Sequence, residues 1–185
     1  GIAEEHALTY GAGLSAAGEK VVVAIYSTFM QRSYDHIIHD VALQNLPITL
    51  CMDRAGLVGE DGPTHHGVFD ISFMRQIPNV IVTSPKDGYE LHDLLYTSFK
   101  SDKIFSIRYG KLSTEYSDNY KPKLLEIGSW VNELDGQDIA ILAVGNMVHT
   151  ALNVASSVKT KYNKNITVIN CRFIKPLDAR LLTDI

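Results

Sequence analysis

The chain has 185 residues, of which 45% are hydrophobic and 21% are charged, and its formal net charge is −4. The acidic balance and the lack of a dense basic cluster exclude a surface for nucleic acid. No apolar run reaches the ~20 residues of a membrane-spanning helix, and the first residues do not resemble a signal peptide. We therefore expect a globular protein of the cytoplasm, without nucleic-acid or membrane partners, that buries one large or two small cores.

The first twenty residues, GIAEEHALTYGAGLSAAGEK, predict a helix of small and apolar residues with Glu4 and Glu5 in its first turn. Acidic side chains are favoured there by the helix dipole, which is the simplest explanation for them. The glycines of GAGLSAAG do not fit G-x-G-x-x-G, and they precede a strand instead of following one. They predict close helix packing and not a dinucleotide site.

Apolar runs of strand length follow along the chain, and they begin at Val21, Ile48, Val80, Ile104, Ile139 and Ile166. Between them, residues 30–45 and 86–100 place apolar side chains at helical spacing. Nearly continuous apolar strands that alternate with helices are typical of a parallel sheet covered on both faces. We therefore predict the α/β class, with a parallel sheet flanked by helices.

The pattern weakens after residue 111 into a polar stretch that ends in the turn-forming DGQ. We predict a first domain over residues 1–117, a linker over 118–137 and part of a second α/β domain over 138–185. One strand-helix-strand unit cannot cover its own sheet edges, so we expect the second domain to be incomplete.

No metal site is predicted. Cys51 and Cys171 lie inside strand-like runs, where buried reduced thiols are expected. Two groups of histidine and aspartate could bind a metal in principle, but adjacent histidines do not easily aim at one ion, and solvated faces are the simpler explanation. These groups are His65, His66 and Asp61, and His36, His39 and Asp40.

Ligands of a doubly wound sheet bind at the carboxyl ends of the strands, so the loops there are the candidate site. The longest of these loops is DRAGLVGEDGPTHHG at residues 53–67. It combines glycines, an arginine, acids and histidines, which is typical of a functional loop. A mobile surface loop with solvated side chains is the alternative.

Three segments resemble a known family: GIAEEHA at the start, YSTFMQRSYDHIIHDVALQNLPI from Tyr26, and DRAGLVGEDGPTHHGVFDISFMRQIPN from Asp53. They resemble the pyrimidine-binding domain of the 1-deoxy-D-xylulose-5-phosphate synthases, which are transketolase-like enzymes that depend on thiamine diphosphate. RFIKPLD near the end resembles the family's carboxyl-terminal domain. The family's amino-terminal domain, which binds the cofactor diphosphate and Mg²⁺, has no counterpart in the chain.

The resemblance implies that Glu4 and His65 are catalytic. Glu4 matches the glutamate that binds the aminopyrimidine ring of thiamine diphosphate and activates the cofactor by sharing a proton with it. The apolar helix is then expected to shield this carboxyl group from water. Phe29 matches the aromatic side chain that stacks on the pyrimidine, and Arg32 matches a residue that lines the cofactor site. Core packing is the alternative for Phe29.

The resemblance also implies substrate-binding roles, for Tyr26, Arg54, Asp61, His65 and Lys111. Tyr26 and Arg54 match positions on the side of the phosphorylated acceptor, where a guanidinium can make two hydrogen bonds to a phosphate. Asp61 and His65 match polar residues that hold the acceptor and assist proton movement. Lys111 stands where the family often has arginine. The positive charge is kept, but the planar guanidinium that can make two hydrogen bonds to a phosphate is lost. Arg32, Tyr26 and Arg54 could each instead be a structural ion-pair or hydrogen-bond partner.

The implied reaction condenses pyruvate with D-glyceraldehyde 3-phosphate and releases carbon dioxide to give 1-deoxy-D-xylulose 5-phosphate. In this family the product is a precursor for isoprenoids, by the non-mevalonate route, and for thiamine. The family's enzymes are homodimers, and the chain is expected to be inactive without the amino-terminal domain. Two alternatives stay open: another thiamine diphosphate enzyme, such as a transketolase or a 2-oxo acid dehydrogenase β subunit, and a noncatalytic pairing module.

Overall fold

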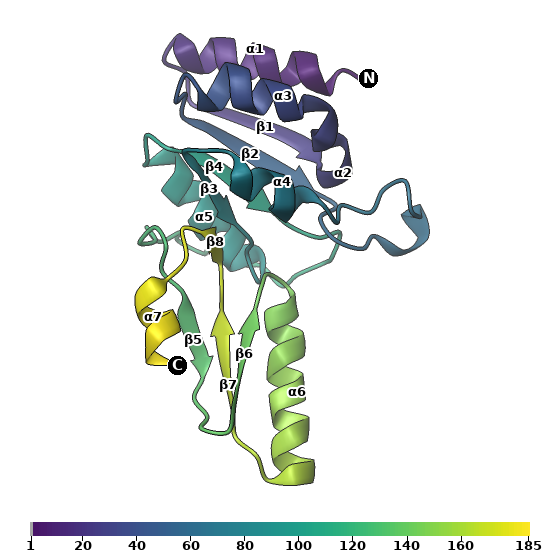
Figure 1. Ribbon diagram of the computed structural model, residues 1–185, viewed down its shortest axis with the longest axis vertical. Helices are drawn as coiled ribbons and strands as arrows, with labels where there is room; N and C mark the ends of the chain where they lie inside the picture. The colour runs from purple at the N-terminus through teal and green to yellow at the C-terminus, as the bar shows by residue number, and fades with distance from the viewer. Residues whose placement is uncertain (1) are drawn as a thin grey trace.

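The predicted apolar runs all form strands in the computed structural model, which describes residues 2–185 (Figure 1). The strands are β1 (Val21–Tyr26), β2 (Ile48–Asp53), β3 (Val80–Thr83), β4 (Ile104–Arg108), β6 (Ile139–Ala143) and β7 (Ile166–Asn170). The first four pair in parallel in the order β1-β2-β4-β3. Parallel neighbours need long crossovers, which the intervening helices supply. The predicted α/β class is confirmed.

Helices cover both faces of this first sheet. Helices α1 (Glu4–Ala16) and α4 (Asp70–Gln76) pack on one face, and α5 (Gly88–Phe99) packs on the other. Side chains of a strand alternate between the two faces, so Val80 and Ile81 belong to different cores. Each face thus buries its own apolar cluster, as the continuous apolar strands predict.

The predicted helix over residues 30–45 is a series of short helical segments that starts directly after β1. The segments are α2 (Ser27–Met30), η1 (Gln31–Ser33), α3 (Tyr34–His36) and the π-helical η2 (Ile37–Ala42). The predicted apolar face still packs inward, since Ile37, Val41 and Ala42 are buried. Because the first turn begins at the strand end, its side chains lie at the carboxyl edge of the sheet.

The second unit contains a strand that the sequence pattern does not predict. Residues 131–134, inside the segment expected to be a linker (118–137), form β5 (Val131–Leu134). This strand pairs antiparallel with β7 in a sheet of order β5-β7-β6. The run VNEL is too short for its period to be recognised, and pairing with β7 decides its structure. These four residues are therefore not linker, while the domain boundaries stay a prediction.

Helix α6 (Met147–Tyr162) covers one face of the second sheet, and α7 (Ala179–Asp184) follows near the end of the chain. Strand β8 (Phe173–Lys175) connects the two units, because it follows β7 and pairs antiparallel with β3 at the edge of the first sheet. The first sheet therefore has one antiparallel edge strand beside the predicted parallel ones.

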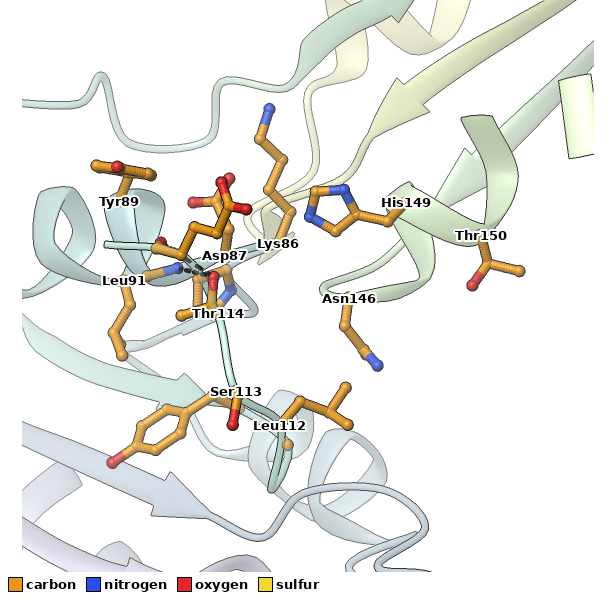
Figure 2. A pocket seen from close by; sticks show the side chains of 15 residues that line it. Lys86, Asp87, Tyr89, Leu91, Leu112, Ser113, Thr114, Asn146, His149 and Thr150 are labelled. Atoms are coloured by element: carbon orange, nitrogen blue, oxygen red, sulfur yellow. Dashed lines mark hydrogen bonds between the residues drawn. The ribbon is translucent and has the colours of Figure 1, made fainter. Parts of the chain in front are cut away.

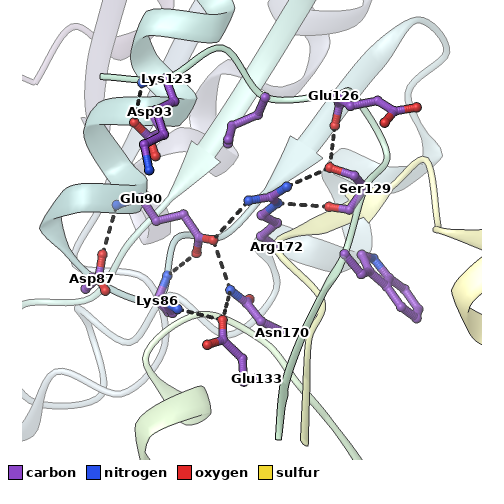
Figure 3. Close-up of polar contacts among 12 residues, drawn as sticks. Lys86, Asp87, Glu90, Asp93, Lys123, Glu126, Ser129, Glu133, Asn170 and Arg172 are labelled. Atoms are coloured by element: carbon purple, nitrogen blue, oxygen red, sulfur yellow. Dashed lines mark hydrogen bonds and ion pairs between the residues drawn. The ribbon is translucent and has the colours of Figure 1, made fainter. Parts of the chain in front are cut away.

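A buried polar network also ties the second unit to the first (Figure 3). At its centre, Glu90 on α5 accepts hydrogen bonds from the backbone N of Lys86 at 2.7 Å and from Asn170 Nδ2 at 2.9 Å. Arg172 lies 3.7 Å from the same carboxylate, and Lys86 pairs with Glu133 on β5 at 2.6 Å. Burial raises the pKa of Glu90, and the hydrogen bonds and cations around it only partly oppose that shift.

We expect Glu90→Gln to change how stability depends on pH. Folding raises the pKa of Glu90, so the native state binds this proton more tightly than the unfolded chain does. The contribution of Glu90 to the free energy of unfolding is therefore complete at low pH, and it is lost as the pH rises through the raised pKa of Glu90. Urea unfolding from about pH 4 to pH 8 should show the wild type losing stability relative to Glu90→Gln. The exposed Glu126→Gln is the control, and parallel curves for wild type and Glu90→Gln would contradict the expectation.

Both cysteines are free and buried, as predicted, and burial raises the pKa of the Cys51 and Cys171 thiols to about 11. Among residues 2–185, no helix combines the length and the apolar composition needed to cross a membrane. The same residues contain no group of three or more histidine, cysteine, aspartate or glutamate side chains placed to hold a metal ion.

Candidate active site

The carboxyl ends of three strands meet at one edge of the first sheet. Tyr26 at the end of β1 pairs with Asp53 at the end of β2, and Met52 of β2 pairs with Arg108 at the end of β4. Because these strands are parallel, the loops that follow them are neighbours in space. The predicted site residues come from these loops and from the amino end of α1.

Glu4, the first residue of α1, lines a cavity of about 470 Å³ at this edge. Its side chain is only 11% exposed, so it is shielded from water as the apolar composition of α1 predicts. One carboxylate oxygen, Oε1, accepts a hydrogen bond from Arg32 Nη1 at 3.2 Å. The other, Oε2, is buried and has no hydrogen-bond partner among the residues described. A buried polar atom without a partner is costly, so Oε2 is available to a ligand in the cavity.

Aromatic rings form another wall of this cavity. Phe29 stacks on Tyr26 with the ring centres 5.5 Å apart and the planes 12° apart. The ring of His65 meets Phe29 edge-on at 5.3 Å, and the Arg32 guanidinium lies 4.9 Å from the Phe29 ring centre. A carboxyl group, a cation and a flat apolar face therefore converge on one space, which suits a planar heterocycle with polar edges.

Arg54 opens the long loop after β2 in a left-handed backbone conformation, with φ of 54°. Its guanidinium forms an ion pair with Asp53 and lies 4.0 Å from the Tyr26 ring centre. These two contacts hold the cation against the strand ends and keep it out of free solvent. Arg54 thus lies beside Tyr26, as the prediction of a shared acceptor side requires.

Lys111 and Asp61 form the outer part of the candidate site. Lys111 Nζ contacts both carboxylate oxygens of Asp61, at 3.0 and 2.9 Å. This hydrogen bond is the main cause of the lowered pKa of Asp61, and the charges of His65 and Arg54 lower it further. Asp61 lies four residues before His65, whose ring contacts Phe29, so the pair belongs to the same loop as this member of the cluster around Phe29. The structure therefore brings all the predicted site residues to one edge of the sheet.

Two glycines close the base of the long loop. Gly56 and Gly67 exchange backbone hydrogen bonds of 2.8 and 2.9 Å. A Cβ atom on Gly67 would lie 2.3 Å from Ser27 Oγ, so only glycine allows the loop to pack this closely against the start of α2. This close packing brings His65, two residues earlier, to the edge of Phe29.

One feature of this edge is absent from the sequence prediction. Arg108, the last residue of β4, forms a buried ion pair with Asp70 at the start of α4. Asp70 lies in a segment that carries the family resemblance, but nothing in the sequence pairs it with Arg108, from which 38 positions separate it. Only the folded chain, which brings the start of α4 to the end of β4, shows the pair.

A second cavity, of about 570 Å³, lies between the two units (Figure 2). Its walls come from the start of α5, the segment after β4 and the start of α6. On one side the backbone N of Gly88 donates a hydrogen bond to Thr114 Oγ1 at 3.2 Å, and Asn146 and His149 lie on the opposite side. None of the predicted site residues lines it. This second cavity is larger than the cavity at Glu4. The cavity at Glu4 is nevertheless the candidate active site, because it contains a buried carboxylate oxygen that has no partner among the described residues.

Models of two protein families match the chain. "Transketolase, pyrimidine binding domain" matches residues 1–115, and "Transketolase, C-terminal domain" matches residues 128–185. The first match contains Glu4 and every loop of the candidate site, and it covers more than half of the chain. The second match begins just before β5.

Relatives match the chain over its whole length. The 1-deoxy-D-xylulose-5-phosphate synthase of Aquifex aeolicus is 52% identical over 185 residues, and that of Clostridium perfringens is 46% identical over 186 residues. Both alignments cover 100% of this chain, but only 29% and 30% of the two relatives. The chain thus spans less than a third of the length of the curated relatives that it matches.

Solved structures share the fold. A split gene transketolase, described as an inactive beta4 tetramer, has a TM-score of 0.85 at 23% identity and covers 98% of this chain and 59% of its own. A transketolase mutant from Pichia stipitis has a TM-score of 0.69 at 20% identity, over 83% of this chain and 23% of its own. At these identities the likeness shows the fold alone.

Proposed function

The chain belongs to the transketolase family through its pyrimidine-binding and C-terminal domains, and we propose that it forms part of a 1-deoxy-D-xylulose-5-phosphate synthase. The single observation that carries this proposal is the Glu4 carboxyl group, buried beside Phe29 and Arg32, with one oxygen that no residue of the described part of the chain hydrogen-bonds. The relatives that match the whole chain support the choice of this synthase over other members of the family.

The proposed reaction joins pyruvate and D-glyceraldehyde 3-phosphate into 1-deoxy-D-xylulose 5-phosphate and carbon dioxide. We propose that it serves as the first step of the non-mevalonate route to isoprenoids and that its product also supplies thiamine synthesis. When bound, thiamine diphosphate supplies a nucleophilic carbon that can also stabilise the negative charge left by loss of carbon dioxide.

The residues around Glu4 fit the pyrimidine half of thiamine diphosphate. Glu4 Oε2 has no partner among residues 2–185 and can hydrogen-bond a ring nitrogen, and Phe29 offers a flat apolar face for the ring. Arg32 binds Oε1 and so restricts the rotation of the carboxyl group. Glu4 can then hold a proton at the pyrimidine ring nitrogen. We assign the diphosphate and Mg²⁺ to the part of the enzyme that this chain does not span.

The acceptor is proposed to bind on the side of the long loop. The guanidinium of Arg54, held by Asp53 and Tyr26, can make two hydrogen bonds to a phosphate, and Lys111 adds a second positive charge. Asp61 can accept hydrogen bonds from acceptor hydroxyl groups. His65 of the same loop meets Phe29 edge-on, where its imidazole can exchange a proton with the acceptor aldehyde oxygen.

We propose that the active enzyme is a homodimer in which this chain is paired with a diphosphate-binding domain. The chain alone is expected to be inactive.

The proposed function is tested by assembling the chain with the amino-terminal domain of a relative and measuring product formation. Release of carbon dioxide and formation of 1-deoxy-D-xylulose 5-phosphate should require pyruvate, D-glyceraldehyde 3-phosphate, thiamine diphosphate and Mg²⁺ together. Turnover with ketose donors would identify a transketolase, and turnover with lipoyl acceptors would identify a dehydrogenase β subunit. Assembly without cofactor binding or turnover would identify a noncatalytic pairing module.

A further inference from the structure

We propose that the buried ion pair of Arg108 and Asp70 is a positioning device that sets the loop over residues 54–69 for binding of the phosphorylated acceptor. Neither residue is proposed to touch the acceptor. The pair acts through Asp61, His65 and the neighbouring cations, so this role rests on the proposed function for the identity of the acceptor.

The ion pair is desolvated and has defined geometry. Arg108 Nε lies 2.6 Å from Asp70 Oδ2, and the side chains are 13% and 2% exposed. Asp70 Oδ1 accepts a hydrogen bond from the backbone N of Ile71 at 2.9 Å, and Arg108 Nη1 donates to Ser84 Oγ at 3.4 Å. Charges attract more strongly here than in water, and removal of one partner would leave the other buried and unpaired. The pair therefore has one strongly preferred arrangement.

Arg108 connects both ends of the loop to the sheet. At the far end, its partner Asp70 comes directly after the loop and begins α4. At the near end, the guanidinium lies under Gly56, because a Cβ atom there would be 3.9 Å from Arg108 Nη2. The adjacent backbone is joined as well, since Ala55 N donates to Tyr109 O at 2.9 Å. One side chain at the end of β4 thus sets where the loop leaves the sheet and where it returns.

Other contacts hold the loop at its base, namely the backbone hydrogen bonds of Gly56 with Gly67 and the hydrogen bond from Val58 N to His66 Nδ1 at 3.2 Å. The loop's only helical structure among the described residues is the short turn Gly59–Asp61, and Leu57 is 78% exposed. The contact of Asp61 with Lys111 is open to solvent, where ion pairs contribute little. The placement of Asp61 and His65 therefore depends on the base of the loop, which the buried pair and the two glycines hold together.

The pair should affect the acceptor more than the cofactor. Lys111 follows Arg108 by three residues, so the strand end that holds the loop also carries the second acceptor cation. Glu4, Phe29 and Arg32 instead come from α1 and the segment after β1, and in the described part of the chain none of them hydrogen-bonds to Arg108 or Asp70. A displaced loop would therefore move the residues that bind the acceptor relative to the residues that bind the cofactor.

The test uses the assembled enzyme with Asp70→Asn, Arg108→Gln and the two changes combined. Each single variant should raise the KM for D-glyceraldehyde 3-phosphate about ten- to hundredfold, while the KM for pyruvate and the Kd for thiamine diphosphate change less than about twofold. The combined variant should recover part of the loss, because it leaves neither charge buried alone. Hydrogen exchange of residues 56–67 should be faster in both single variants.

Glu90→Gln is the matched control, because it changes another buried, ion-paired carboxylate at the interface of the two units. It should leave the acceptor KM and the exchange of residues 56–67 unchanged. If Asp70→Asn does not fold, Arg108→Lys replaces it, because lysine keeps the positive charge but lacks the planar guanidinium. The acceptor KM, the pyruvate KM and the cofactor Kd are then compared in that variant.

Two results would overturn the proposal: loss of folded enzyme with an unchanged acceptor KM, or equal changes in the acceptor KM, the pyruvate KM and the cofactor Kd. If the wild-type assembly makes no 1-deoxy-D-xylulose 5-phosphate, the proposed function fails instead. Hydrogen exchange then still decides whether the pair sets the loop, and unchanged exchange in the single variants would refute that.

Discussion

Glu4→Gln is expected to lower the turnover number of the assembled enzyme by about 10²–10⁴-fold, the range that a positioned proton-transfer group contributes. Glutamine keeps the size of the side chain and can still accept a hydrogen bond from Arg32, which binds Oε1 at 3.2 Å in the wild type. It cannot hold an acidic proton at the position of Oε2, which in the wild type is buried and has no partner within the described residues. Steady-state turnover at saturating pyruvate and acceptor measures the effect.

The control for this experiment is Glu5→Gln, one position along the same helical turn. Glu5 does not line the cavity at Glu4, so its replacement should leave turnover near the wild-type value. Thiamine diphosphate affinity should be measured for both variants by titration. Near-normal turnover of Glu4→Gln with normal cofactor affinity would remove the basis of the proposed function, and equal losses in both variants would indicate damage to α1 alone.

Arg54→Ala is expected to lower kcat/KM for D-glyceraldehyde 3-phosphate by about 10- to 100-fold, as loss of hydrogen bonds between charged groups implies. The physical reason is that Asp53 and the Tyr26 ring already hold this guanidinium at the strand ends. The Arg54 side chain therefore loses little conformational entropy when the acceptor binds. Most of the loss should be in KM. The measurement compares this acceptor with D-glyceraldehyde, which has no phosphate.

The loss should largely disappear with the unphosphorylated acceptor, because Arg54 then has no phosphate to bind. Arg75→Ala, which removes an exposed arginine from α4, is the control and should have little effect on either acceptor. Equal losses with both acceptors would show that Arg54 supports the fold of the loop and does not select the phosphate.

The parallel core could be predicted because β2, β3 and β4 are buried on both faces, while the edge strand β1 is buried on one face and still apolar throughout. Runs such as VVVAIY and ITLCMD are apolar at nearly every position, and such runs need no partner to be recognised. The strands at 131–134 and 173–175 could not be predicted in this way. Each has four residues or fewer, and each forms only because β7 or β3 offers an unpaired edge.

The candidate site could be predicted only in part. The rule that parallel strands end at one edge predicts that the loops at Tyr26, Asp53 and Arg108 are neighbours. The resemblance to a family supplied Glu4, whose position in a helix turn would otherwise have been explained by the helix dipole. The ion pair of Arg108 with Asp70 was missed, since 38 positions separate the two residues and no local pattern pairs them.

By itself the sequence determined where the strands and helices lie and which loops follow the parallel strands, because hydrophobic periodicity and turn residues act over a few neighbouring positions. The tertiary structure alone decided that one buried oxygen of Glu4 has no partner in the part of the chain that is described, that Arg54 lies on the Tyr26 ring and that Arg108 joins both ends of the long loop. Such contacts join residues far apart in the chain. Burial and hydrogen bonding there depend on how the whole sheet closes, and no local pattern of residues contains that information.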